Sequence, residues 1–208
     1  MAVNSLDLIP ASPGVRYPAA VTIDGRRYTL RLMTQDDGPL IIAFALTLAP
    51  DDQLYLRRDI TKVPVVNGWL RQLSPTSFQT LLLVDANGEV QGYANIDRSP
   101  AAWMHHVAEL RVMVGPALRG FGAGRLLTEE AFRVALEMGV TKVVGQLMVE
   151  QTGAIGIFRS LGFQPEALLR DHVKDRQGGS HDLVILSCQV GSLSSKLDLY
   201  GVTEALAD

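Results

Sequence analysis

LRVMVGPALRGFGAGRLLTEEAF, residues 110–132, joins a strand-like apolar run to a glycine-rich turn and the start of a helix. Three glycines fall within the five residues that precede Arg125, and they let backbone N–H groups converge without obstruction by Cβ atoms. The helix that follows adds unpaired N–H groups and the positive end of its dipole. The turn therefore predicts an anion site that suits a diphosphate, with Arg119 and Arg125 as flanking charged donors.

Two common phosphate-binding motifs fit this turn poorly. A P-loop ends in Gly-Lys-Ser/Thr, but here the chain continues as Gly124-Arg125-Leu126. A dinucleotide fold requires Gly-x-Gly-x-x-Gly, and counted from Gly120 the third glycine position holds Arg125. Glu150 ends the next expected strand and imitates the acid that binds ribose, so a nucleotide-dependent oxidoreductase stays as an alternative. The turn, however, follows antiparallel hairpins and not the first strand of a parallel sheet.

The chain before the turn is organised as paired strands with a helical layer between them. Asp24-Gly25 is a dipeptide typical of a tight hairpin turn, and a turn that ends at Gly88 joins a second strand pair. The expected elements are extended pieces within 21–33, helices over 39–49 and 65–73, and strands over 78–84, 90–96 and 105–114.

After the turn the apolar residues follow helical spacing. The stripe from Leu127 to Met138 predicts a helix that ends at Gly139, and a second stripe ends at Gly162. A strand over 141–149 separates them, and a hairpin over 167–174 and 181–189 closes the pattern. These elements predict an α/β fold with one mixed, mostly antiparallel sheet. We expect an irregular arm over 1–20, one domain over 21–190, and over 191–208 an extension made of a polar linker and a short helix.

Composition excludes several classes of protein. The chain has 208 residues, a net charge of −3, four histidines and one cysteine, which argues against a disulfide framework and a Cys/His zinc site, so no metal site is expected. The longest apolar stretch, residues 41–49, is far shorter than a membrane span, and the N-terminus lacks a signal-peptide pattern. No Lys/Arg run indicates nucleic-acid binding. We expect a cytoplasmic protein with neither nucleic-acid nor membrane partners.

The turn and its surroundings resemble the GNAT superfamily of N-acyltransferases. Arg119-Gly120-Phe121-Gly122-Ala123-Gly124 follows the pattern Arg-x-x-Gly-x-Gly/Ala, and the segment from Ala154 to Leu161-Gly162-Phe163 resembles a second element of that family. The resemblance covers roughly residues 27–190. It implies a GNAT-like fold with helices on both faces of the sheet and a splayed strand pair that holds the co-substrate.

The same resemblance implies which residues contact acetyl-CoA or another acyl-CoA. In that family the glycine turn binds the pyrophosphate, and the strand before it pairs with the pantetheine arm. The expected set is Val112, Met113, Val114, Arg119, Gly120, Phe121, Gly122, Ala123, Gly124, Arg125 and Gln151. The alternative for the glycines is tight packing of a helix against a strand.

Glu109 is the candidate catalytic residue. Its place ten positions before Arg119 resembles that of the general base in this family, and such a carboxylate needs burial or a water relay to deprotonate an amine. The alternative is a solvated strand residue paired with Arg111. His105 and His106 are weaker candidates for the base, and His172 and His181 are expected at the surface of the last hairpin.

One position departs from the family pattern. The helix after Val149 usually begins with Asn and carries a Tyr that protonates the departing thiolate, but this chain has Gln151 and Phe158. Phe158 cannot donate a proton and is expected in the core. Cys188 is expected to be a small buried residue. The missing Tyr keeps open a non-catalytic module that binds or senses acyl-CoA.

The acceptor is the least specified part of the sequence. DGRRYTLRLMTQDD, residues 24–37, is similar to the start of GNAT domains in bacterial protein-lysine acetyltransferases, and residues 38–74 would form the acceptor side of the cleft. Asp51, Asp52 and Asp59 would attract a cation there, or are solvated loop charges. The expected acceptor is a small-molecule amine or a protein lysine, and assembly as a homodimer stays open.

Overall fold

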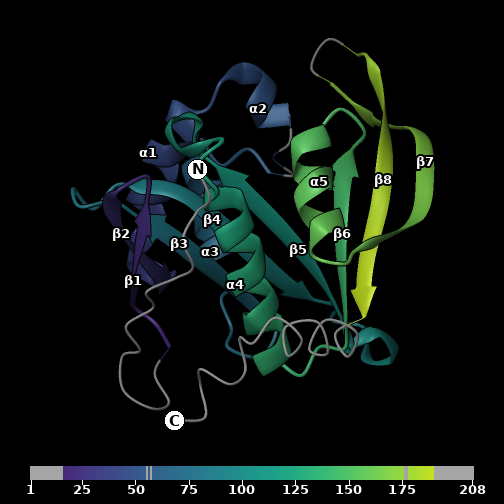
Figure 1. Ribbon diagram of the computed structural model, residues 1–208, viewed down its shortest axis with the longest axis horizontal. Coiled ribbons are helices and arrows are strands. Elements are labelled where there is room, and N and C mark those ends of the chain that lie inside the picture. The colour runs from purple at the N-terminus through teal and green to yellow at the C-terminus, as the bar shows by residue number, and fades with distance from the viewer. Residues whose placement is uncertain (1–15, 55, 57, 176–177, 190–208) are drawn as a thin grey trace.

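An eight-stranded sheet forms the centre of the molecule (Figure 1). The computed structural model describes residues 16–54, 56, 58–175 and 178–189. The strand order is β1-β2-β3-β4-β5-β6-β8-β7. The strands are β1 (Ala19–Ile23), β2 (Arg26–Leu32), β3 (Phe78–Val84), β4 (Val90–Arg98), β5 (Val107–Val114), β6 (Lys142–Met148), β7 (Gln164–Lys174) and β8 (Ser180–Gln189).

All neighbouring strands run antiparallel except β5 and β6, which are parallel. Asp24 and Gly25 both adopt positive φ, 49° and 72°, as the tight turn between β1 and β2 requires. The mixed, mostly antiparallel sheet expected from the sequence is confirmed. The parallel pair is where the chain crosses over through a helix, as such a connection must.

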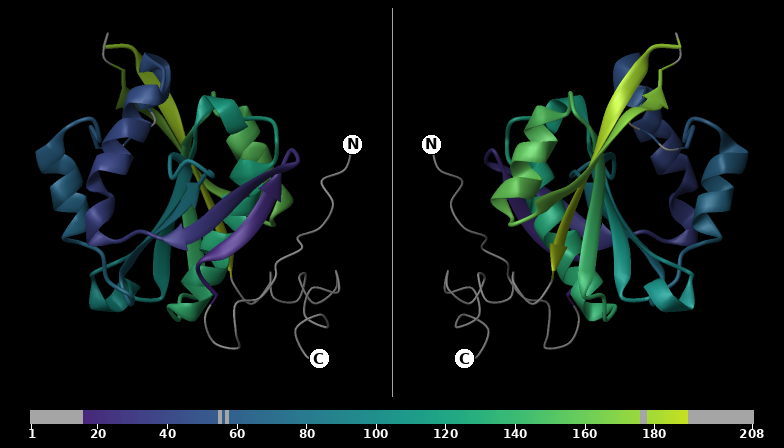
Figure 2. Two further views of the ribbon diagram at one scale, coloured as in Figure 1. Left: turned by 90° about the vertical axis from the view of Figure 1, so that its left-hand side faces the viewer. Right: turned by 90° about the vertical axis from the view of Figure 1, so that its right-hand side faces the viewer.

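Helices cover both faces of the sheet. Figure 2 shows α1 (Gly38–Thr47), α2 (Pro50–Leu54) and α3 (Val63–Leu70) on one side and α4 (Ala123–Glu137) and α5 (Thr152–Ser160) on the other. Short 3₁₀ turns complete the connections at η1 (Gln35–Asp37), η2 (Ala102–Met104) and η3 (Pro116–Leu118). Two buried apolar clusters correspond to the two faces, one beneath α4 and α5 and one beneath α1 and α3.

The predicted apolar stripes account for the packing of α4 and α5. Leu127 is fully buried, and the stripe of α4 ends before Gly139, which has a φ of 74°. Phe158 of α5 packs edge-on against Phe163, with 4.8 Å between ring centroids. Cys188 is buried on β8, as expected.

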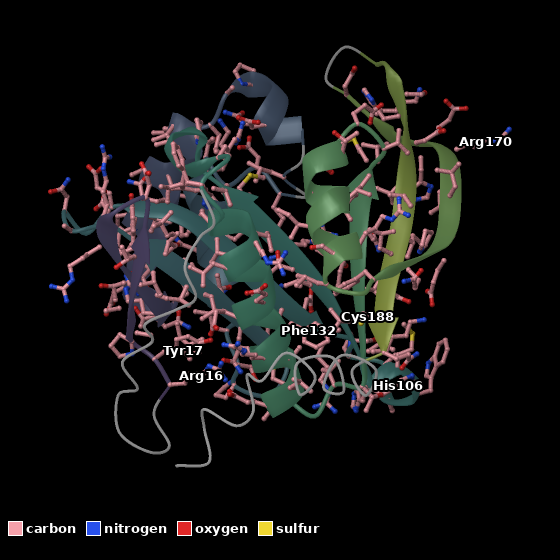
Figure 3. All side chains as sticks on the ribbon, viewed as in Figure 1. Arg16, Tyr17, His106, Phe132, Arg170 and Cys188 are labelled. Carbon is pink, nitrogen blue, oxygen red and sulfur yellow. The ribbon has the colours of Figure 1, made fainter. Side chains whose placement is uncertain are left out.

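Several elements differ from the sequence prediction. β1 begins at Ala19, inside the segment expected to be irregular, because Arg16 and Tyr17 are already held against α4 (Figure 3). β5 begins at Val107 and not at 105, since the preceding residues form η2 and its cap. α2 was not predicted, because five residues carry too little periodicity. β7 begins at Gln164, three residues before the expected start. The extension expected over 191–208 lies outside the described residues.

Candidate functional site

The glycine turn leads directly into α4. Gly120 and Gly122 have φ values of 80° and 86°, a region that side chains with a Cβ rarely adopt, and Gly122 is the N-cap of the helix. In the part of the chain that the structure describes, no backbone acceptor lies within hydrogen-bond distance of the N–H groups of Gly122–Arg125. These four donors sit at the positive end of a 15-residue helix, so the turn has the electrostatics of an anion site.

The turn stands at the open end of a splayed strand pair. β5 and β6 pair over only three residues, Val107–Glu109 with Lys142–Val144, although both strands continue beyond them. Figure 1 shows the two strands diverging toward the end where α5 begins. The splay expected from the family resemblance is therefore present.

Hydrogen-bond alternation decides which backbone groups face this gap. The N–H of Gly115 donates to the carbonyl of Gln91 at 2.8 Å, so the antiparallel ladder pairs odd-numbered residues of β5 with β4. The backbone groups of Val112 and Val114 then point toward β6, where no strand meets them. Met113 differs from the expectation, because its backbone pairs with Tyr93 and only its side chain is available to a ligand.

The two arginines beside the turn already have protein partners. Arg119 donates to the carbonyl of Val114 at 3.3 Å and forms an ion pair with Asp52 of α2 at 2.9 Å. Arg125 donates through Nε to Glu129 at 2.8 Å and through Nη1 to Ser160 at 3.3 Å. Phosphate contacts by Arg119 would compete with Asp52, which links the glycine turn to α2.

Gln151 and Phe158 both have structural roles at the start of α5. The Gln151 side-chain oxygen accepts from the N–H of Met148 at 2.9 Å, so it joins β6 to the helix. Phe158 is 4% exposed, and its ring covers Gly145 so closely that a Cβ built there would lie 2.5 Å from the ring. The core position expected for Phe158 is confirmed, and this side chain offers no proton donor.

Glu109 lies on the sheet face that α1 and α3 cover. It forms an ion pair with Arg111, two residues along the same strand, which matches the structural alternative considered for it. Its cross-strand neighbour on β4 is Asp97, so two carboxylates occupy the same level of the sheet. Both acids lie at the last pairs before β5 and β6 separate.

A cavity opens beside these acids, between the sheet and the helical layer that follows α2. Its lining comprises Leu56, Arg58, Ile60, Trp69, Phe78, Tyr93, Asn95, Asp97, Arg111, Val112 and Met113. It reaches the gap at Val112, so a group held in the cavity can meet a ligand that pairs with β5. Of the residues that line this cavity, the sequence prediction included only Val112 and Met113 as site candidates.

The remaining cavity residues were missed for a physical reason. Tyr93, Asn95 and Asp97 alternate along β4 and face the same side, a signal that was available in the sequence. That side becomes a binding surface only where Trp69 and Arg58, distant in sequence, fold over it. No local pattern gives that juxtaposition.

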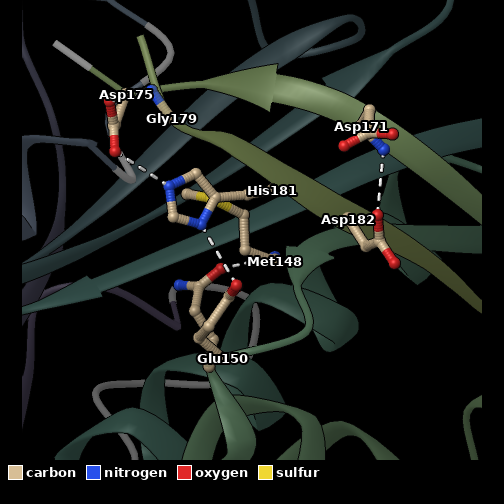
Figure 4. Close-up of polar contacts among 8 residues, drawn as sticks. Met148, Glu150, Asp171, Asp175, Gly179, His181 and Asp182 are labelled. Atoms are coloured by element: carbon tan, nitrogen blue, oxygen red, sulfur yellow. Dashed lines mark hydrogen bonds and ion pairs between the residues drawn. The ribbon is translucent and has the colours of Figure 1, made fainter. Parts of the chain in front are cut away.

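The histidines lie away from this cavity. His105 caps η2 and contacts the carbonyl of Pro100 at 3.1 Å. Figure 4 shows His181 of β8 between two carboxylates, with Nδ1 3.1 Å from Glu150 and Nε2 3.2 Å from Asp175. Hydrogen bonds that His181 donates to Glu150 and to Asp175 raise the pKa of His181, and the contact with His181 lowers the pKa of Glu150. This cluster joins the β6–α5 turn to the β7–β8 hairpin.

Comparison with known proteins identifies one family. A family model described as "Acetyltransferase (GNAT) family" matches residues 46–163, more than half of the chain. No curated protein matches the sequence closely enough to count as a relative. In the part of the chain that the structure describes, no helix is both long and apolar enough to cross a membrane.

Many solved structures share the fold. The GNAT domain of S. lividans PAT is 20% identical with a TM-score of 0.70, over 86% of this chain and 99% of that one. A ribosomal-protein-alanine N-acetyltransferase from Brucella melitensis is 25% identical with a TM-score of 0.67, over 77% and 98%. yncA from Salmonella typhimurium, solved with its cofactor acetyl-CoA, is 22% identical with a TM-score of 0.66, over 78% and 94%.

Proposed function

The chain belongs to the GNAT family of acetyltransferases, and from that premise we propose that it acylates a primary amine by direct attack within a ternary complex. The donor is acetyl-CoA or another short acyl-CoA. The acceptor is a small molecule or a protein lysine. Three features support the proposal: an anion site at the glycine turn, an open strand edge beside it, and a cavity lined by Asp97 and Arg111 that reaches the gap at Val112.

The observation that carries the proposal is the set of unpaired N–H groups at Gly122–Arg125. Donors at a helix N-terminus suit a pyrophosphate, because they combine hydrogen bonds with the helix dipole. From that anchor the backbone groups of Val114 and Val112 continue along β5 on the side that β6 leaves unpaired. A pantetheine arm bound there brings its thioester to the cavity.

Acyl transfer then requires a neutral amine and removal of its proton. We assign the base to Glu109, which lies at the last pair before β5 and β6 separate and which forms an ion pair with the cavity-lining Arg111. The amine nitrogen bonds to the thioester carbon, the C–S bond breaks, and the amine proton passes to Glu109 directly or through water. Thiols have pKa values near 8.5, so the thiolate takes a proton from water without the missing Tyr.

Release of free thiol from acetyl-CoA in the presence of an amine panel tests the activity. Once an acceptor is found, Glu109→Gln should lower kcat by about 10² to 10⁴-fold, the usual contribution of a general base. Glu89→Gln is the matched control, since Glu89 is exposed at the β3–β4 turn. Full kcat in the Glu109 variant would remove the base assignment.

A different result would favour the non-catalytic alternative. Tight acetyl-CoA binding by calorimetry, with no thiol release from any amine, would indicate a module that binds acyl-CoA without turnover. Phe158→Tyr would not be expected to rescue such a protein, because this ring is buried against Gly145 and faces the core.

A further inference from the structure

Tyr93 brings a polar atom into the cavity without a protein partner. Only 6% of the residue is exposed, and its ring is fixed by edge-on contacts with Trp69 and Phe44, at centroid distances of 5.2 and 5.9 Å. No described residue hydrogen-bonds to the Tyr93 hydroxyl. Every fully enclosed side-chain N or O atom of the described residues does have a partner, so this hydroxyl is not fully enclosed. The hydroxyl is therefore reached from the cavity that Tyr93 lines.

Arg58 brings an uncompensated positive charge to the same cavity. Its Nη1 donates to the side-chain oxygen of Gln72 at 2.8 Å, and its guanidinium lies 6.0 Å from the ring centroid of Phe78. Both partners are neutral, and within the described residues no carboxylate forms an ion pair with Arg58. The guanidinium is thus positioned but its charge is not neutralised.

Charged groups of both signs lie in and beside the cavity. Arg111 is paired with Glu109, and Asp97 lies across from Glu109, so both acids lie near the β5–β6 pairing. Arg58 lies over Phe78, the β3 neighbour of Asp97, and it lines the same cavity as Tyr93. Burial raises the pKa of Tyr93, while the positive charges of Arg111 and Arg58 oppose this rise, which places both cations within electrostatic reach of the hydroxyl.

We infer that the acceptor is a small amino acid, an amine that also carries a carboxylate, and that Arg58 and the Tyr93 hydroxyl bind this carboxylate. The inference rests on the proposed function and specifies its acceptor. An amine without the carboxylate would fill the cavity and leave the charge of Arg58 unbalanced and the Tyr93 hydroxyl without a hydrogen bond, which costs binding energy. A carboxylate accepts hydrogen bonds from both donors, and its charge balances that of Arg58.

Matched acceptor pairs test the inference in the full chain. Each amino acid is compared with the amine formed by its decarboxylation: β-alanine with ethylamine, phenylalanine with phenethylamine, and arginine with agmatine. We expect kcat/KM, measured by thiol release, to be at least about tenfold higher for the best amino acid than for its matched amine. Arg58→Gln should remove this ratio and Tyr93→Phe should reduce it, whereas Arg71→Gln, an exposed arginine that ends α3, should retain it.

Trp69 supplies a readout that does not depend on turnover. The chain has two tryptophans, and Trp103→Phe removes the exposed one, so Trp69 beside Tyr93 becomes the sole reporter. With free coenzyme A bound, titration of the preferred amino acid should shift Trp69 emission saturably, and Arg58→Gln should abolish that shift while its thermal midpoint stays unchanged.

The two hypotheses fail in different ways. Equal kcat/KM for amino acids and their matched amines, or an Arg58→Gln variant that keeps the preference, would overturn the inference and leave acyltransfer intact. Saturable Trp69 quenching by an amino acid without thiol release from any amine would support the carboxylate site and overturn the proposed catalysis. The inference would also be rejected if no amino acid changed Trp69 emission and none were preferred over its matched amine.

Discussion

Glu130 is a carboxylate almost completely removed from solvent, on the face of α4 that packs against the sheet. It is 1% exposed and accepts a hydrogen bond from the Tyr17 hydroxyl at 2.8 Å. Arg133 and Arg16 pair with it, the latter at 3.4 Å, and its charge raises the pKa of Tyr17 further than burial alone does. A buried carboxylate with two cations and a hydroxyl is fully satisfied, so the loss of any member exposes the others to an apolar surrounding.

We therefore expect Glu130→Ala to lower the free energy of unfolding by about 3–5 kcal/mol, because it leaves Arg133 uncompensated. Glu137→Ala is the matched control: this side chain is 57% exposed and pairs with Arg16 at 3.2 Å, so its loss should cost about 1 kcal/mol or less. Urea denaturation of both variants measures the difference, and equal values would show that burial of Glu130 has no energetic weight.

Single residues of the site were predictable where chemistry and local pattern agree. The glycines of the turn indicate backbone with positive φ, and the apolar stripe of α5 predicts that Phe158 lies in the core. Arg58 and Tyr93 carried no such signal. The role proposed for them depends on which neighbours they lack among the described residues: Arg58 has no carboxylate beside it, and the Tyr93 hydroxyl has no hydrogen-bond partner. Such features can be recognised only from the three-dimensional structure.

The β7–β8 hairpin shows how one element is attached by ionisable groups. His181 links it to the turn before α5 through Glu150, and links its two strands through Asp175. The pKa of His181 is raised above its ordinary value of 6.5. The stabilisation from protonated His181 is therefore complete below pH 6.5 and is lost as pH rises through the raised folded-state value.

Thermal midpoints from about pH 5 to about pH 8 test this contribution. We expect His181→Asn to unfold at a lower temperature than the unmodified chain near the acid end, and the gap to shrink as pH rises. At still lower pH the gap should close again, since Glu150 becomes protonated. His106→Asn, an exposed histidine before β5, should follow the parent curve throughout. Parallel curves for both variants would contradict the linkage.

Among the elements, those with strong turn signals were located best. Asp24-Gly25 and Gly88 fixed two hairpins, and β3 was predicted with its observed bounds, Phe78–Val84. α2 was missed, although it carries the Asp52 that pairs with Arg119. The start of β1 was missed as well, because what orders that segment is the contact of Tyr17 with α4, more than a hundred residues away.

At the scale of the whole molecule, a ligand that binds only the folded state stabilises it by mass action. Acetyl-CoA at a hundred times its dissociation constant should raise the free energy of unfolding by about 2.7 kcal/mol. Gly122→Ala should reduce the accompanying rise in thermal midpoint, since a Cβ at a φ of 86° costs about 1–2 kcal/mol or displaces the turn. An undiminished rise in that variant would place the coenzyme elsewhere.

The three-residue ladder between β5 and β6 has a consequence for how the enzyme holds itself together. Eight strands share one sheet, but within it β5 and β6 are hydrogen-bonded at one end only and leave a gap at the other. In the proposed complex the pantetheine arm pairs with β5 in this gap as a short additional strand, so the bound substrate becomes part of the sheet. The amide hydrogens of Val112 and Val114 should then exchange with deuterium more slowly when the pantetheine arm is bound than when the gap is empty.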